Sequence, residues 1–239
     1  MPKGQVVQLA PEKYGGLMDE QETAAYLGYG KQLPDADMLT QLRHCADMLL
    51  PALSPRYMFV PVRLLREGAD AQGTLAADFG AEKLVLPGKA IRAHLGETGL
   101  AVAACLTLGE AVDERIDKLQ KESMLDALLT DALANAAVER LRMELEQDVK
   151  ETLGLAVGWL FGIGYEDFPL TLQHDFLRCM AAKEGIGLSV NGQGILSPLK
   201  SVTGFLDIRD GFQKGEKRCD GRCGMCQKRE ECRFFKGAR

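Results

Sequence analysis

One stretch of the sequence, residues 123–149, has the apolar spacing of a single long amphipathic helix. Its apolar residues recur every three or four positions, so they share one side of the helix and have to be covered by other elements. Small residues in the middle of that side allow another element to pack closely against it. The predicted core stripe consists of Leu125, Leu129, Ala132, Ala136, Leu141 and Leu145, and Ala134 and Ala137 are further small residues at its centre.

Shorter helices and strands are interspersed along the remaining sequence. Asp19 and Asp35 are predicted N-caps, because a carboxylate at that position accepts hydrogen bonds from the first turn of a helix. Since helices and strands do not alternate regularly, we expect an α+β fold in which mixed helices surround a twisted antiparallel sheet. Further helices are predicted over residues 87–95, 109–120 and 167–183, and strands over residues 56–65, 83–86, 100–106, 194–197 and 201–208.

The composition is that of an ordinary globular protein. The 239 residues are 46% hydrophobic and carry a net charge of −5, and this is enough chain for one large core or two modest ones. The first residues lack the apolar segment of a signal peptide, and the longest apolar run, residues 99–106, is too short to cross a bilayer. We therefore expect a cytoplasmic protein that does not associate with membranes.

Four of the seven cysteines lie within residues 219–239. Cys219, Cys223, Cys226 and Cys232 have the spacing C-x3-C-x2-C-x5-C, and the short polar, glycine-containing loops between them let four thiolates converge on one metal centre. Cytoplasmic thiols stay reduced, which favours a metal over disulfides. The sequence therefore predicts a main domain, residues 1–208, followed by a basic metal-binding tail, residues 209–239.

The metal of this tail is predicted to be iron or zinc. Structural zinc sites usually join two close cysteine pairs through a longer loop, whereas these four cysteines are crowded, which favours a 4Fe-4S cluster over zinc. Residues 211–239 hold nine Lys/Arg and four Asp/Glu, a net charge of +5, so residues 1–210 carry −10. The basic tail can offset an anionic thiolate centre or dock on an acidic surface. Nucleic acid is not an expected partner, since only Phe234 and Phe235 could stack on bases.

The other cysteines and the histidines show no catalytic or metal-binding spacing. Cys45, Cys105 and Cys179 lie in apolar stretches, which is typical of small buried hydrophobic residues rather than reactive thiols. No residue of the chain is predicted to be catalytic.

Several short motifs, taken in order, resemble the activation domain of vitamin B12-dependent methionine synthase. The likeness is closest to the short free-standing relatives of that domain and extends over about residues 20–208. No single motif is decisive, but their order and spacing together are specific. The motifs are Leu86-Pro87-Gly88-Lys89, Thr107-Leu108-Gly109-Glu110-x-Val112-Asp113, the helix from Asp131 to Arg140, Gly164-Tyr165-x-Asp167-x-Pro169-Leu170-x-x-Gln173, and Ser197-Pro198-x-Lys200-Ser201-Val202-Thr203.

The resemblance implies an α+β domain that binds S-adenosylmethionine and caps the cobalamin domain of a partner chain. In that family the domain supports reductive methylation, in which oxidised Co(II) takes up one electron and is trapped by the methyl group of S-adenosylmethionine. The chain would then be a component of cobalamin-dependent methionine synthase rather than an independent enzyme, and its cysteine tail would deliver the electron. Such a site needs positioning more than acid–base chemistry, because the sulfonium methyl is already activated.

Four residues are predicted to line the S-adenosylmethionine site. Gly164 and Tyr165 occupy the glycine–tyrosine motif of the family. Asn135 and Glu139 lie one turn apart on the long helix, where small neighbours leave room for a ligand.

The chain departs from the family pattern at the residue expected to grip the methionine carboxylate. Leu160 stands where the family has an arginine, Ile163 replaces a usual proline, and residues 192–193 read Gly-Gln in place of a common Glu-Ser. Either Arg56 or Lys200 supplies the missing cation, or S-adenosylmethionine binds weakly or not at all. The alternative function is therefore a non-catalytic partner-binding module with a zinc-stabilised tail that has lost S-adenosylmethionine. A redox-sensing protein without a corrinoid partner is a third reading.

Overall fold

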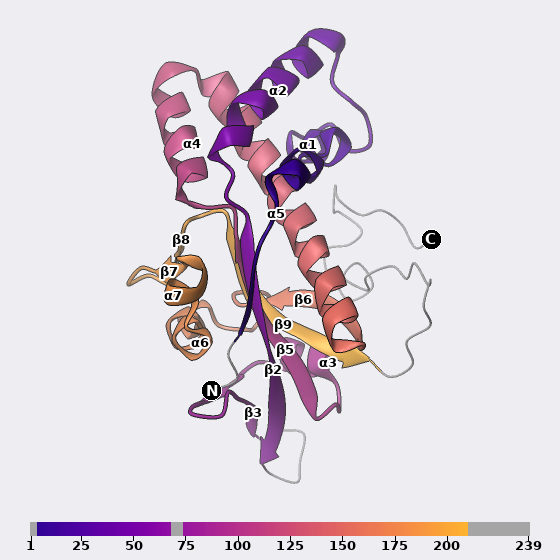
Figure 1. Ribbon diagram of the computed structural model, residues 1–239, viewed down its shortest axis with the longest axis vertical. Helices are drawn as coiled ribbons and strands as arrows, with labels where there is room; N and C mark the ends of the chain where they lie inside the picture. The colour runs from indigo at the N-terminus through magenta and orange to yellow at the C-terminus, as the bar shows by residue number, and fades with distance from the viewer. Residues whose placement is uncertain (1–3, 68–73, 210–239) are drawn as a thin grey trace.

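The computed structural model describes residues 4–67 and 74–209 (Figure 1). Apart from Arg209, the predicted tail domain lies outside the described residues, and with it Cys219, Cys223, Cys226 and Cys232. The strands are β1 (Gln5–Gln8), β2 (Arg56–Glu67), β3 (Thr74–Asp78), β4 (Lys83–Val85), β5 (Leu100–Thr107), β6 (Ala156–Gly162), β7 (Ser189–Val190), β8 (Leu196–Ser197) and β9 (Ser201–Arg209). The helices are α1 (Glu20–Tyr26), α2 (Ala36–Leu49), α3 (Lys89–Leu95), α4 (Glu110–Glu122), α5 (Met124–Leu153), α6 (Gln173–Met180) and α7 (Ala182–Ile186), with short 3-10 helices at Pro11–Leu17, Leu50–Ala52 and Leu170–Leu172.

One antiparallel sheet forms the centre of the molecule. Its strands follow the order β4-β3-β2-β5-β9-β6, and β1 pairs with the first part of β2. Strands β7 and β8 form a separate two-stranded pair. The arrangement confirms the predicted α+β fold with an antiparallel sheet, whereas β1, β3, β6 and β7 are not predicted by the sequence patterns.

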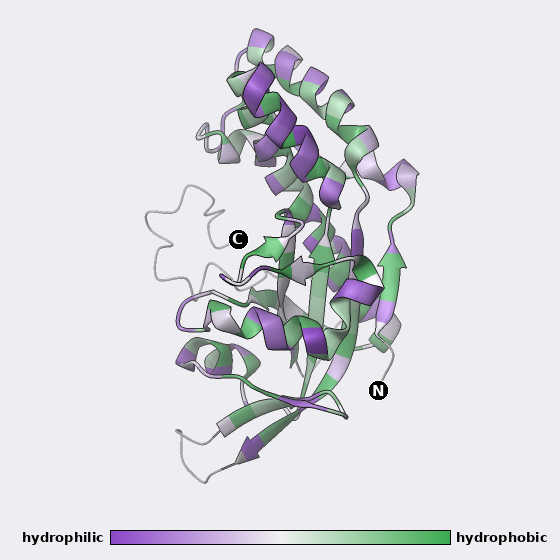
Figure 2. Ribbon diagram, turned by 90° about the vertical axis from the view of Figure 1, so that its left-hand side faces the viewer, coloured by the Kyte–Doolittle hydropathy of each residue, from purple (hydrophilic) through white to green (hydrophobic). Residues whose placement is uncertain are grey.

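Side chains alternate between the two faces of this sheet, and each face has its own helical cover. On β2, Tyr57 and Phe59 belong to a core shared with α2, α4 and α5, whereas Met58 and Val60 belong to a core shared with α3, α6 and α7. We call these two sides the α5 face and the α6 face. Figure 1 shows the long helix α5 lying across the first of them, and Figure 2 shows hydrophobic residues running along the strands between the two layers.

The long helix α5 forms as predicted, with one exception in its core stripe. Ser123 Oγ accepts a hydrogen bond from the Asp126 amide at the start of the helix, and Gly154 ends it in a left-handed conformation. The predicted stripe is buried except for Leu125, which is 46% exposed. That residue lies in the first turn of the helix, where its side chain points to solvent.

The segment after residue 163 differs from the predicted single helix over residues 167–183. It contains the 3-10 helix Leu170–Leu172, then α6 and α7, which are separated at Ala181 by a backbone with φ of 52°. Asp167, the first residue of that predicted helix, does not begin a helix, because its carboxylate is bonded to the start of α3 instead. Likewise α3 begins at Lys89 with Gly88 as its N-cap, not at Pro87.

Within the part of the chain that the structure describes, none of the helices combines the length and the apolar character needed to span a membrane.

Candidate functional site

Two of the sequence motifs meet at the start of α3. The carboxylate of Asp167 accepts hydrogen bonds from the backbone N–H groups of Lys89, at 2.6 Å, and Ala90, at 3.0 Å. These two N–H groups, first that of Ala90, hold the pKa of Asp167 below its ordinary value. Asp167 therefore caps a helix that lies far from it in the sequence, and the Gly164–Gln173 motif is fixed against the Leu86–Lys89 motif.

Two further motifs meet where the end of β5 lies beside the start of β9. The carboxylate of Asp113 accepts a hydrogen bond from the Leu199 amide at 2.6 Å, while burial raises the pKa of Asp113 above its ordinary value. Ser201 Oγ donates to the Pro198 carbonyl at 2.7 Å and is hydrogen-bonded to Thr107 Oγ1 at 2.9 Å. The Leu108 amide donates to the carbonyl of Lys200 at 3.0 Å, so the backbone that carries Lys200 is held from both sides. These motif residues thus position the loop before β9.

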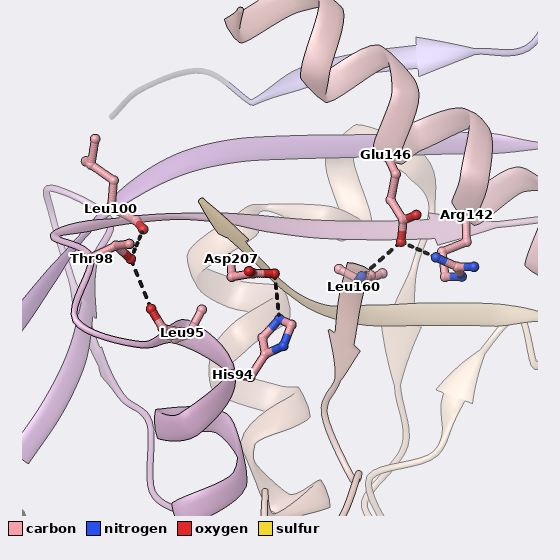
Figure 3. Close-up of polar contacts among 8 residues, drawn as sticks. All are labelled: His94, Leu95, Thr98, Leu100, Arg142, Glu146, Leu160 and Asp207. Atoms are coloured by element: carbon pink, nitrogen blue, oxygen red, sulfur yellow. Dashed lines mark hydrogen bonds and ion pairs between the residues drawn. The ribbon is translucent and has the colours of Figure 1, made fainter. Parts of the chain in front are cut away.

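Position 160 is a core position in this fold. Leu160 is 2% exposed and packs in the core of the α5 face. Its amide donates to Glu146 Oε1 at 2.9 Å, and Glu146 is paired with the buried Arg142, as Figure 3 shows. Arg142 also donates to Glu139 at 3.0 Å. Because the side chain at position 160 is apolar and buried, it cannot hold a ligand carboxylate, and a cation for that role would have to come from another residue.

Tyr165 follows β6 at the edge of the sheet, where its ring lies 5.8 Å, centroid to centroid, from the ring of Phe161 of the α6 face and also approaches Gly162. Gly162 follows Leu160 by two residues, so the side chain that it lacks would point toward the same face, and a Cβ there would stand 2.8 Å from the Tyr165 ring. Gly204 lies opposite Gly162, and a Cβ on it would overlap the Phe161 carbonyl. The tyrosine is 46% exposed, so its ring covers the backbone of Gly162 and still reaches solvent.

The two predicted ligand residues on α5 carry polar partners on the same face. Asn135 Oδ1 accepts a hydrogen bond from Lys200 Nζ at 2.8 Å, and Asn135 Nδ2 donates to Asp131 Oδ2 at 3.0 Å. Lys200 Nζ is also 2.7 Å from Asp131 Oδ1. Glu139, one turn further along α5, accepts from Arg142 at 3.0 Å. The spacing 131, 135, 139 places these three side chains on one side of the helix. Asp131 is not among the predicted ligand residues, although this spacing could have identified it from the sequence.

Of the two cations considered as substitutes for an arginine at position 160, only Lys200 lies on this face. Arg56 belongs to the alternate set of β2 residues, and its guanidinium is 3.8 Å from where a Cβ on Gly187 at the end of α7 would stand, which is on the α6 face. Gly204 pairs with Gly162, the last residue of β6, and it follows Lys200 by four residues, about 13 Å along a strand. Gly164 lies in the turn after β6, where its amide donates to the Phe168 carbonyl at 2.9 Å. We use the name α5-face site for Asp131, Asn135, Glu139 and Lys200, together with Gly164 and Tyr165 at the end of β6.

Comparisons with known proteins agree with this architecture. No protein-family model matches the sequence, and a search of curated proteins finds no match. A solved structure, the MetH reactivation domain bound to AdoHcy, is similar over 88% of this chain and 80% of that chain, with a TM-score of 0.66 and 13% sequence identity. The chain has the fold of that reactivation domain. At this identity the similarity concerns the fold, so a function has to be argued from the residues of the site.

The cysteines within this reactivation-domain fold are poorly suited to nucleophilic chemistry. Burial raises the pKa of Cys45 and of Cys179 to about 11, and it raises that of the fully buried Cys105 further still. No group of three or more His, Cys, Asp or Glu side chains in residues 4–67 and 74–209 is placed to hold a metal ion. The predicted metal ligands of the tail lie outside these residues, so the metal site stays a prediction.

Proposed function

We propose that this chain is the reactivation component of a cobalamin-dependent methyltransferase, and specifically of methionine synthase. It would cap the cobalamin domain of a partner chain, which carries the cobalamin, and bind S-adenosylmethionine at the α5-face site. One observation carries the proposal. A fold shared with a domain solved with AdoHcy places Asn135 and Glu139 on one side of α5, with the Lys200 cation bonded to Asn135.

The residues of the α5-face site would act by position rather than by proton transfer. The corrinoid of the partner supplies the nucleophile for the sulfonium methyl group, which needs no acid or base to leave its sulfur. The Tyr165 ring over the bare backbone of Gly162 would offer a flat apolar surface for the adenosyl group. The polar residues of α5 would fix the other end of the ligand and so orient the methyl group.

The cysteine tail would serve the same reaction by holding the centre that delivers the electron. A 4Fe-4S cluster on Cys219, Cys223, Cys226 and Cys232 fits this role, because iron–sulfur potentials extend to about −700 mV and the corrinoid needs a low-potential donor. Zinc on the same four cysteines would make the tail a structural unit instead.

The burial of Leu160 favours one competing function. Without a cation at that position the chain would be a non-catalytic module that binds a partner through the same fold and does not bind S-adenosylmethionine. Calorimetric titration of the full chain with S-adenosylhomocysteine separates the two functions, since only the first predicts saturable binding at one site.

Replacing Tyr165 by alanine is expected to weaken S-adenosylhomocysteine binding about ten- to a hundredfold. Burying an aromatic side chain against a ligand contributes about 1.5–3 kcal/mol, and 1.4 kcal/mol is tenfold in affinity. The matched control is Tyr29→Ala, since Tyr29 in the loop after α1 is 40% exposed and Tyr165 is 46% exposed. Equal losses in the two variants would remove Tyr165 from the site, and a wild-type chain without binding would favour the non-catalytic module.

A further inference from the structure

The α5-face site contains a closed triangle of one cation, one carboxylate and one neutral amide, which matches the amino-acid end of an adenosyl ligand. We propose that Lys200, Asp131 and Asn135 read the zwitterionic α-amino acid group of S-adenosylmethionine or S-adenosylhomocysteine, with Lys200 holding its carboxylate and Asp131 its ammonium. This inference rests on the proposed function and deepens it, because it names the residues that take the place of the arginine that is missing at position 160.

The geometry of the triangle supports an exchange of partners. Lys200 Nζ lies 2.7 Å from Asp131 Oδ1 and 2.8 Å from Asn135 Oδ1, and Asn135 Nδ2 lies 3.0 Å from Asp131 Oδ2. A ligand carboxylate can replace Asp131 as the partner of the ammonium, while the ligand ammonium becomes a new partner for Asp131. Each charge keeps a charge-assisted hydrogen bond, so binding leaves none of the three side chains unpaired.

Burial and anchoring suit these residues to recognition. The Lys200 side chain is 15% exposed and that of Asp131 is 43% exposed, so a ligand can approach from the Asp131 side toward a largely desolvated ammonium. Charged contacts are stronger in such surroundings than in bulk water. The backbone around Lys200 is held by the Leu108 amide and, one residue earlier, by Asp113. The ammonium is therefore preorganised, which lowers the entropic cost of binding.

The same contacts would also arise if the ion pair only fastened the start of β9 to α5, and the test has to separate the two roles. The experiment titrates the full chain with two ligands, S-adenosylhomocysteine and its decarboxylated analogue, which keeps the amine. Lys200→Met is expected to weaken the binding of S-adenosylhomocysteine about ten- to a hundredfold, because a hydrogen bond to a charged group contributes an affinity of about that size. The affinity for the analogue should fall less than about twofold in this variant, because the analogue has no carboxylate for Lys200 to bind.

Two further variants complete the design. Asp131→Asn is expected to weaken both ligands by similar factors, because both carry the amine. Lys183→Met, an exposed lysine of α7, should leave both affinities unchanged. Equal losses for the two ligands in Lys200→Met, or no loss for either, would overturn the inference while the proposed function stands. Failure of the wild-type chain to bind either ligand would overturn both, and retained binding of the analogue by Lys200→Met shows that this variant is folded.

Discussion

Replacing Arg142 by methionine is expected to lower the free energy of unfolding by about 3–5 kcal/mol. The Arg142 side chain is 3% exposed and that of Glu146 is 9% exposed, so the variant would leave a carboxylate buried without its cation. Glu146 also accepts the Leu160 amide at the outer edge of β6, which ties the sheet to α5 at this point. Urea denaturation followed by circular dichroism measures the effect as a shift of the transition midpoint at an unchanged slope.

Two control variants test whether the unpaired buried charge is the cause. Lys118→Met removes a cation from an exposed ion pair with Glu122 on α4, and we expect a loss of less than about 1 kcal/mol. The double variant Arg142→Met with Glu146→Gln keeps an acceptor for the Leu160 amide and removes the buried charge, so it should recover much of the lost stability. An Arg142→Met variant as stable as Lys118→Met would contradict this view of the core.

Replacing Cys226 by serine is expected to remove most of the metal bound to the chain. The loss of one of four thiolates opens the coordination of either an iron–sulfur cluster or a zinc ion. Protein purified without oxygen should contain stoichiometric iron with the broad visible absorption of a cluster, or one zinc per chain and no colour. Cys179→Ser is the control, because Cys179 lies on α6 outside the tail and should leave metal content unchanged.

A wild-type chain that holds neither iron nor zinc in stoichiometric amount would contradict the metal-binding tail. If iron is present, a Cys226→Ser variant that still supports reactivation at the wild-type rate would separate the cluster from electron delivery. Zinc without iron would favour the structural role of the tail.

Local chemistry explains which elements could be predicted from the sequence. Asp19 and Asp35 cap the helices that directly follow them, and in each case the carboxylate accepts an amide three residues ahead. Asp167 has the same residue type before a helical segment, yet its carboxylate caps α3, 78 residues away. The sequence does not show which of two helix starts lies nearer in space. The sequence pattern does not predict strand β6, because the strand contains glycines and a register irregularity between Val157 and Leu160 breaks the alternation of its side chains.

The candidate site could be predicted only in part, for the same reason. Helical spacing places Asn135 and Glu139 on one side of α5, and the motif indicates Tyr165. The choice between Arg56 and Lys200 depends on which face of the sheet each side chain occupies, and this follows from strand register rather than from sequence distance. The burial of Leu160 likewise becomes visible only once β6 is placed beneath α5.

The central claim is most directly tested by measuring reactivation itself. A cobalamin-dependent methionine synthase that lacks its own reactivation domain would be oxidised to the inactive Co(II) form and supplied with a reductant and S-adenosylmethionine. The recovery of its activity would then be followed with and without the full chain described above. The proposed function predicts recovery that requires both the chain and S-adenosylmethionine. The synthase used has to be the chain's own cognate partner. With that partner, a recovery rate that is the same in the presence and in the absence of the chain would contradict the proposed function.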